Sequence, residues 1–173
     1  MHSLILHPDC KPGPVHALSA QIEPTHGGCH VRFRIEGEIS RIKIPFFAPP
    51  GRADDLWKTT CFECFWQHEG SRGYREFNFS PSSEWAAYDL EDYRTGYSNP
   101  EVAAVAVACA YNGDELTLHA NIGAVLPLPA HVALTAVIED RDGGMEYWSL
   151  AFPPGAPDFH HPACRTLKLA GAL

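Results

Sequence analysis

Two cysteines three positions apart, Cys61 and Cys64, form the CxxC pattern that is typical of zinc and redox sites. They lie in the run TTCFECFW, Thr59 to Trp66, which we expect to be a β-strand. Side chains three apart on a strand point to opposite faces, with Cα atoms about 10 Å apart. Two thiolates on one zinc ion need sulfur atoms within roughly 4 Å of each other. We therefore predict two structural cysteines and no metal site.

Acidic, amide and aromatic residues of the central segment could bind a sugar. A pyranose is held by aromatic rings against its C–H faces and by carboxylates and amides that hydrogen-bond its hydroxyls. Glu76 and Asn78 alternate with two phenylalanines in YREFNFS. If these phenylalanines face the core, the polar pair lies on a solvated outer face or lines a concave one. The candidate binding residues of this segment are Trp57, Trp66, Trp85, Tyr88, Glu63, Glu76 and Asn78.

Some of these residues have alternative roles. Core or edge packing is the other use of Trp85 and Tyr88. A glycosidase needs two acids about 5 to 10 Å apart in a cleft, and Glu63 and Glu76 on neighbouring strands could meet that spacing. Such a pair on one sheet face more often has a structural or ligand-holding role, and the sequence has no G-x-S-x-G, P-loop, Rossmann or HExxH motif. We therefore predict no enzymatic activity.

A second candidate cluster is DFHHP, Asp158 to Pro162. Adjacent histidines in a proline-rich loop can bind metal, accept a sugar hydroxyl or ligate haem iron, and Asp158 could orient an imidazole. The alternative is a capped turn, in which the Asp and His side chains bond to local backbone before Pro162. Two neighbouring histidines on an extended segment point apart. We keep Asp158, His160 and His161 as candidate ligand-binding residues.

The elements that must position these residues are short β-strands. The 15 Pro and 14 Gly are spread along the chain, and alternating runs lie between them. Only Val102 to Ala110 could pass for a helix, but its valine alternation and the Asn-Gly that follows favour a strand. The expected strands are His16–Pro24, Cys29–Ile39, Cys61–His68, Tyr74–Ser80, Trp85–Leu90, Val102–Tyr111, Glu115–Ile122, His131–Asp140, Met145–Phe152 and Cys164–Ala170.

This pattern predicts an all-β protein of roughly ten to twelve strands, arranged as an antiparallel sandwich or barrel. The absence of internal repeats and linkers predicts a single domain over residues 1–173. The net charge of −8 and the absence of basic runs argue against nucleic acid and anionic membranes as partners. The apolar run Leu4 to Leu6 is too short for a signal peptide, so we expect a cytoplasmic protein with reduced cysteines.

Three stretches of this sequence resemble the DOMON-like family of small bacterial proteins. They are LWKTTCFECFW and YREFNFSPSSEWAAYDLEDYRTGY, within Leu56 to Tyr97, and YWSLAFPPGAPDFHHP, Tyr147 to Pro162. The family is related to DOMON domains and family 9 carbohydrate-binding modules, so the resemblance implies a two-sheet antiparallel β-sandwich of jelly-roll type. Cys64 departs from the family pattern, where an apolar residue is expected, and this supports a packing role for it.

The resemblance implies a module that binds a small ligand without catalysis, most directly a saccharide. Haem is an alternative, because some DOMON domains hold it through a Met and a His. Met145 with His160 or His161 would then be the pair to test. An interaction or scaffold domain without a ligand pocket is a further alternative. Open strand edges would allow a homodimer, and the sequence does not decide between monomer and dimer.

Overall fold

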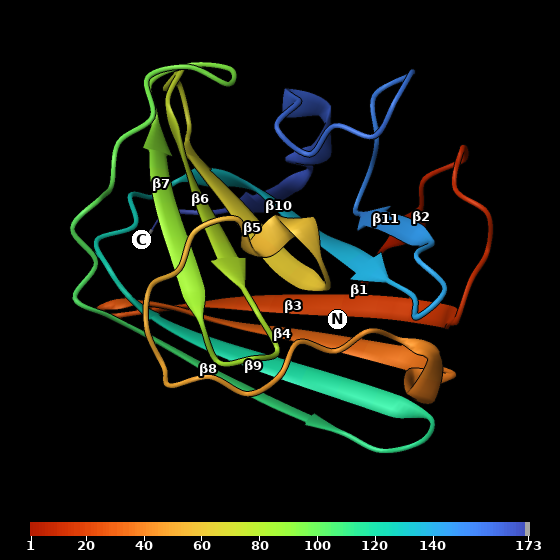
Figure 1. Ribbon diagram of the computed structural model, residues 1–173. Coiled ribbons are helices and arrows are strands. Elements are labelled where there is room, and N and C mark those ends of the chain that lie inside the picture. The colour runs from red at the N-terminus through yellow and green to blue at the C-terminus, as the bar shows by residue number, and fades with distance from the viewer. Residues whose placement is uncertain (172–173) are drawn as a thin grey trace.

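The computed structural model describes residues 1–171 as twelve strands in two antiparallel sheets that pack face to face. The two-sheet β-sandwich predicted from the sequence is therefore confirmed. Figure 1 shows β5, β6 and β7 steeply inclined to β3, β4 and β9, which lie below them. The helical elements among the described residues are three short 3-10 helices, η1 (Ile39–Arg41), η2 (Leu56–Lys58) and η3 (Pro162–Cys164).

The strands follow a regular order within each sheet. The first sheet runs β1 (His2–Ser3), β3 (Val15–Thr25), β4 (Gly28–Gly37), β9 (Glu115–Gly123) and β8 (Ala104–Tyr111). The second sheet runs β2 (Ile5–Leu6), β11 (Met145–Ser149), β10 (Ala130–Glu139), β5 (Cys61–His68), β6 (Tyr74–Phe79) and β7 (Trp85–Leu90), and β12 (Leu167–Leu169) also pairs with β10.

All ten expected strands are present, with differences at their ends. Ile39 begins a 3-10 helix instead of ending β4, because the chain turns after Glu38, whose carbonyl accepts a hydrogen bond from the Arg41 N–H. Cys164 likewise belongs to η3, where Pro162 starts the helical turn. The two-residue strands β1 and β2 were not expected, because alternation cannot be recognised over two residues.

Alternate residues of the central strands fill the core between the sheets. On β5, Phe62, Cys64 and Trp66 face the first sheet and are buried. The ring of Phe62 lies 5.0 Å from that of Phe33 on β4, and both side chains are fully buried. This inner layer is the main source of stability, since burying apolar surface contributes roughly 25 cal/mol per Å².

The opposite face of the second sheet is covered as well. A smaller buried cluster on this outer side includes Phe65 of β5, Tyr74 of β6 and Val137 of β10. Phe159 and Cys164, from the segment after β11, pack onto it. Strand β5 therefore lies between two apolar layers. The outer face is not the simple solvated surface that an exposed antiparallel sheet presents.

The two cysteines of the CxxC pattern point to opposite sides of β5. Cys64 belongs to the core between the sheets, whereas Cys61 packs with Leu56 and Ala86 on the outer side. All six cysteines are free, as the strand geometry predicted for this pair. Burial raises the pKa of both thiols well above the usual value, so both are protonated and unreactive packing residues.

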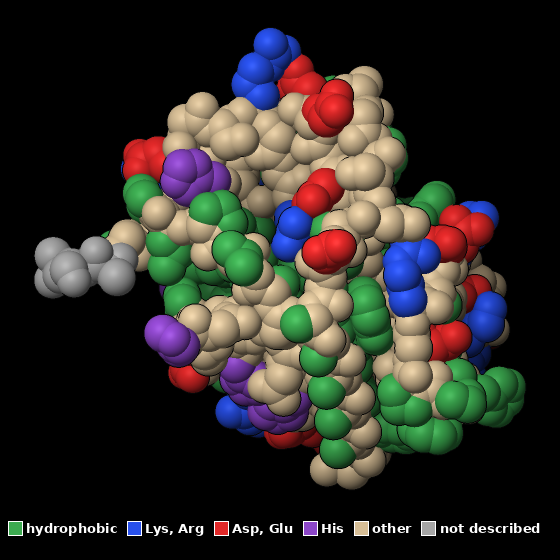
Figure 2. Space-filling view, turned by 90° about the vertical axis from the view of Figure 1, so that its left-hand side faces the viewer, with side chains coloured by type: hydrophobic (Ala, Val, Ile, Leu, Met, Phe, Trp, Pro, Cys, Tyr) green, Lys and Arg blue, Asp and Glu red, His purple; other side chains and the backbone are tan. Residues whose placement is uncertain are grey.

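Opposite charges lie next to each other on the surface. Arg75 Nε is 2.6 Å from Asp89 Oδ1, and Arg34 Nη2 is 2.7 Å from Glu115 Oε2. The face displayed in Figure 2 shows acidic and basic side chains interspersed. The side chains of Arg34 and Glu115 are both more than a third exposed, and a pair of this kind contributes only a little to stability. No helix in residues 1–171 has the length and hydropathy needed to cross a membrane.

Replacing Phe62 by alanine tests the role of the inner layer. The fully buried ring leaves a cavity when it is removed, and we expect a loss of about 3–5 kcal/mol in the free energy of unfolding. Phe46→Ala is the matched control, because the Phe46 side chain is 97% exposed and should change stability by no more than ~0.5 kcal/mol. Urea unfolding measures the free energy of unfolding of both variants. Equal effects of the two variants would contradict this assignment of the core.

Candidate ligand-binding site

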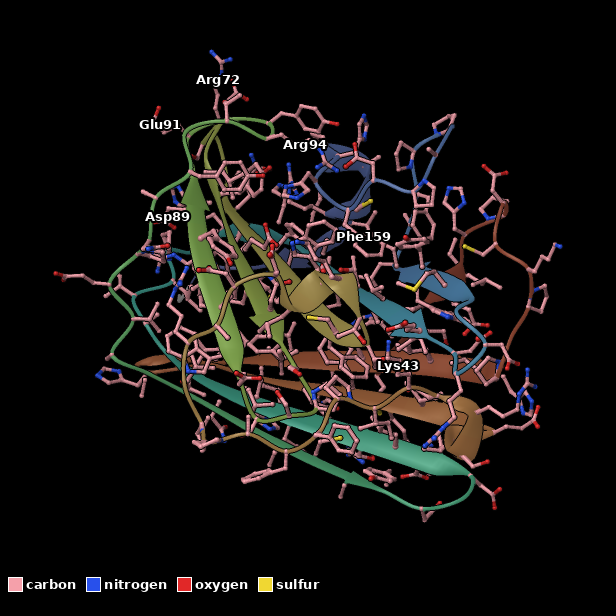
Figure 3. The ribbon with its side chains drawn as sticks, in the orientation of Figure 1. Lys43, Arg72, Asp89, Glu91, Arg94 and Phe159 are labelled. Atoms are coloured by element: carbon pink, nitrogen blue, oxygen red, sulfur yellow. The ribbon has the colours of Figure 1, made fainter. Side chains whose placement is uncertain are left out.

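A cavity of about 610 Å³ lies against the outer face of the second sheet. The sheet forms its floor, and three covering segments form its walls: the residues around η2, the loop after β7 and the segment after β11. Figure 3 shows Arg94 and Phe159, from two of these segments, beside β5 and β6 and on the side away from β3 and β4. The lining residues are Asp54, Asp55, Trp57, Glu63, Glu76, Tyr88, Arg94, Tyr97, Val137, Tyr147, Pro157, Phe159 and His160.

Two buried carboxyl groups form the polar centre of the floor. In the β5–β6 register, Glu63 pairs with Asn78 and Phe65 pairs with Glu76. Glu63 and Glu76 are therefore diagonal neighbours on one sheet face, a relation that typically spans about 7–8 Å. Only 3% of Glu63 and 5% of Glu76 is exposed. The alternation expected in YREFNFS is confirmed, with Phe77 in the core and Glu76 on the cavity side.

The environment of these carboxyl groups favours their neutral form. Burial raises the pKa of Glu63 well above its usual value, and the neighbouring Glu76 raises it further. Burial also raises the pKa of Glu76. The hydrogen bonds that oppose these shifts are few: Thr135 Oγ1 donates to Glu63 Oε2 at 3.2 Å, and Asn78 Nδ2 donates to Glu76 Oε1 at 2.8 Å. Burial is the largest cause of both shifts and favours the protonated form of each carboxyl group, while the nearby charge of Arg94 acts in the opposite direction.

Arg94 is the only lysine or arginine among the described residues that line the cavity, and Asp158 holds it. Its guanidinium donates to Asp158 Oδ1 at 2.9 Å, and the Tyr93 hydroxyl donates to Asp158 Oδ2. Burial raises the pKa of Asp158, but the hydrogen bonds from Tyr93 and Arg94 outweigh it, and the pKa is lowered. Asp158 therefore stays ionised and fixes Arg94 at the cavity wall.

The two adjacent histidines have different roles, because their side chains point apart as expected. His161 accepts a hydrogen bond at Nδ1 from the Ala163 backbone and so caps η3, in agreement with the capped-turn alternative. His160 lines the cavity. Its Nδ1 lies 2.8 Å from the Tyr74 hydroxyl, and its Nε2 lies 3.7 Å from Glu76 Oε2.

The His160 imidazole is neutral at physiological pH. Burial and the nearby charge of Arg94 lower its pKa to about 4. Asp158 does not orient the ring through a side-chain bond. It accepts a bond from the His160 backbone N–H at 3.1 Å instead, and the Tyr74 hydroxyl positions the ring. With Nδ1 facing Tyr74, an Nε2–H directed at the Glu76 carboxyl suits this geometry.

Aromatic rings form much of the wall. Trp57, on η2, is 50% exposed and lies at the cavity. Tyr88 donates from its hydroxyl to Asp54 Oδ1 at 2.6 Å, and its ring lies edge-on to that of Tyr97 at 6.4 Å. Tyr147 contacts Phe159 in a similar edge-on arrangement at 6.0 Å. These contacts fix the rings around a mixed apolar and polar hollow, which is the usual character of small-ligand sites.

Several sequence-predicted candidates lie elsewhere. Trp66 belongs to the core and donates to the Pro127 carbonyl at 2.9 Å, and Trp85 packs against the same core. Both rings therefore pack within the fold. For Trp85 this agrees with the alternative role, core or edge packing, that the sequence left open. Asn78 lies on the same sheet face as Glu76 and donates a hydrogen bond to it, but does not line the cavity. Met145 packs with the outer cluster and is not part of the lining, so the structure does not bring the proposed haem pair together in this cavity.

Other lining residues were not singled out from the sequence. Asp54, Asp55, Arg94 and Tyr97 lie on loops, where the pattern of alternation gives no direction for a side chain. Tyr147 could have been found, because it alternates with the core residue Trp148 on β11 and must face the other side. Phe159 sits directly before the His pair, but as an apolar loop residue it carried no chemical signal.

One solved structure has a fold similar to that of this chain. The chain is similar to a proposed carbohydrate-binding protein from Bacteroides uniformis, with a TM-score of 0.65 over 95% of this chain and 83% of that one. The two sequences are 14% identical, so the likeness shows a shared fold. No protein-family model and no curated protein matches the chain. The resemblance to the DOMON-like family therefore stays a prediction.

Glu63→Gln and Glu76→Gln test the burial of the two carboxyl groups. A raised pKa means that ionisation opposes folding, so the native protein loses stability as pH rises through the folded-state pKa. Glutamine cannot ionise. At about pH 8 we expect the melting temperature of each variant to be ~2–4 °C above that of the native protein. At about pH 5 the increase in melting temperature should be smaller.

Glu101→Gln is the matched control, because Glu101 is exposed outside the cavity and should show no such difference. Thermal melting followed by circular dichroism measures all three variants at both pH values. A stability gain that does not change with pH would contradict the assignment.

Proposed function

We propose that this protein binds a saccharide non-covalently in the cavity on the outer face of the second sheet. The observation that carries this proposal is the combination of aromatic walls with a buried polar floor in a hollow of about 610 Å³. Pockets of roughly 300–1,000 Å³ are typical of small-ligand sites. The shared fold with a proposed carbohydrate-binding protein supports the same class of ligand.

Each part of the cavity suits a part of a sugar. The C–H faces of a pyranose pack against aromatic rings, and Trp57, Tyr88 and Tyr147 offer such rings at the wall. Sugar hydroxyls need both donors and acceptors. Arg94 and the His160 imidazole can donate, whereas the carboxyl oxygens of Glu63 and Glu76 can accept.

The arrangement of the two acids favours binding over hydrolysis. Glycosidases place their acids on either side of the scissile bond, so that one protonates the leaving oxygen while the other attacks or activates water. Glu63 and Glu76 extend from adjacent strands of the sheet that forms the cavity floor. A sugar above this floor would meet both acids from the same side. We therefore propose a module without hydrolytic activity.

Quenching of tryptophan fluorescence by a panel of mono- and disaccharides tests the proposal. Trp57 is the one tryptophan that lines the cavity in the described residues, so Trp57→Ala should abolish the quenching and weaken binding roughly tenfold. Isothermal titration calorimetry supplies the affinity independently of fluorescence. Tyr111→Ala is the control, since Tyr111 is 61% exposed at the end of β8 and outside the cavity.

Two results would overturn the proposal. One is the absence of heat and quenching with every sugar of the panel. The other is sugar binding that Tyr111→Ala weakens as much as Trp57→Ala does, because the binding surface would then lie outside the cavity.

A further inference from the structure

Most charged groups around the cavity already have a partner of opposite charge. Asp54 lies 3.0 Å from Arg52, and Asp55 lies 2.7 Å from Lys58. Arg94 is held by Asp158. In each of these pairs the opposite charges already compensate each other. None of them therefore needs a charged group of the ligand as a partner.

Glu63 and Glu76 differ from these groups, because neutral side chains surround them in the described structure. Thr135 from β10 and Asn78 from β6 donate the direct hydrogen bonds. The neutral His160 imidazole approaches Glu76 at 3.7 Å. The charge of Arg94 acts on both carboxyl groups, but no direct contact joins it to either of them, and its nearest carboxylate is Asp158.

Both carboxyl groups are more than nine-tenths buried and face the cavity. Burial without a cationic partner favours the protonated form of an acid, since the ionised form would lose its hydration without compensation. A cation delivered by the ligand would supply that compensation. The aromatic rings of the wall would add to the attraction, because their faces are electron-rich and favour positive charge.

We propose that the saccharide carries a protonated amino group, which binds beside Glu63 and Glu76. This inference rests on the proposed function and names its ligand class as amino sugars. The ammonium group donates to carboxyl oxygens that Thr135 and Asn78 leave free, while the sugar ring packs on the aromatic wall. Binding displaces a proton from the carboxyl pair to solvent as the pair becomes ionised.

Matched sugars that differ at one substituent test this proposal on the native protein. The probes are glucosamine, galactosamine and mannosamine, each compared with its parent hexose and its N-acetyl derivative. We expect at least one free amine to bind roughly tenfold more tightly than both of its neutral counterparts, because charge-assisted hydrogen bonds are about twice as strong as neutral ones. Isothermal titration calorimetry in buffers of different ionisation enthalpy should also detect the released proton.

The variants Glu63→Gln and Glu76→Gln, alone and together, identify the groups responsible. In these variants we expect the ratio of the affinity for the amine to that for its neutral counterparts to fall toward one, and the proton release to disappear. Circular dichroism confirms that each variant is folded. Glu101→Gln should keep the full preference. A preference that survives in the double variant would overturn the inference.

Two further outcomes separate this inference from the proposed function. If neutral sugars bind at least as tightly as their amines, the amino-sugar inference fails and saccharide binding stands. If no sugar binds but a simple aromatic amine such as benzylamine does, saccharide binding fails, and the amino-sugar inference falls with it.

Discussion

In β5, the six residues from Cys61 to Trp66 are all buried, so both faces of the strand are covered. The inner face contributes Phe62 to the core between the sheets, and the outer face contributes Phe65 to a second cluster. This double burial places Glu63 in a confined polar hollow instead of in bulk water. The cavity exists because the segments around it cover the sheet incompletely. These segments still shield the carboxyl groups of Glu63 and Glu76 from bulk water, and this burial raises the pKa of both groups.

The covering layer is held by polar contacts that also shape the cavity. Asp158 bonds Arg94 and Tyr93, which joins the segment after β11 to the loop after β7. The Tyr74 hydroxyl accepts a hydrogen bond from the Arg94 backbone N–H and contacts the His160 ring. These contacts connect β6 to both segments. Each contact contributes modestly to stability, because the groups that it joins give up hydrogen bonds to water when it forms. Together they fix the walls of a site whose floor is rigid sheet, a combination that favours selective binding.

The buried acids work against the stability of the fold. Two carboxyl groups on one sheet face lose hydration and repel each other when ionised. The apolar core, with rings such as Phe33 and Phe62, offsets this penalty. Groups that destabilise the native state are typical of binding and catalytic sites, where a ligand supplies what the fold lacks. Packing alone therefore does not explain why Glu63 and Glu76 are present on the cavity floor.

The sequence by itself determined ten of the twelve strands, the alternation of side chains along β5 and β6, and the separation of Cys61 from Cys64, because side chains alternate along a strand whatever the strand packs against. Only the tertiary structure decided which outward residues line the cavity. Trp57 reached the cavity whereas Trp85 packed on the core, and Arg94 entered from a loop that has no periodicity. Which surfaces face each other depends on contacts between distant segments, and local alternation carries no information about those contacts.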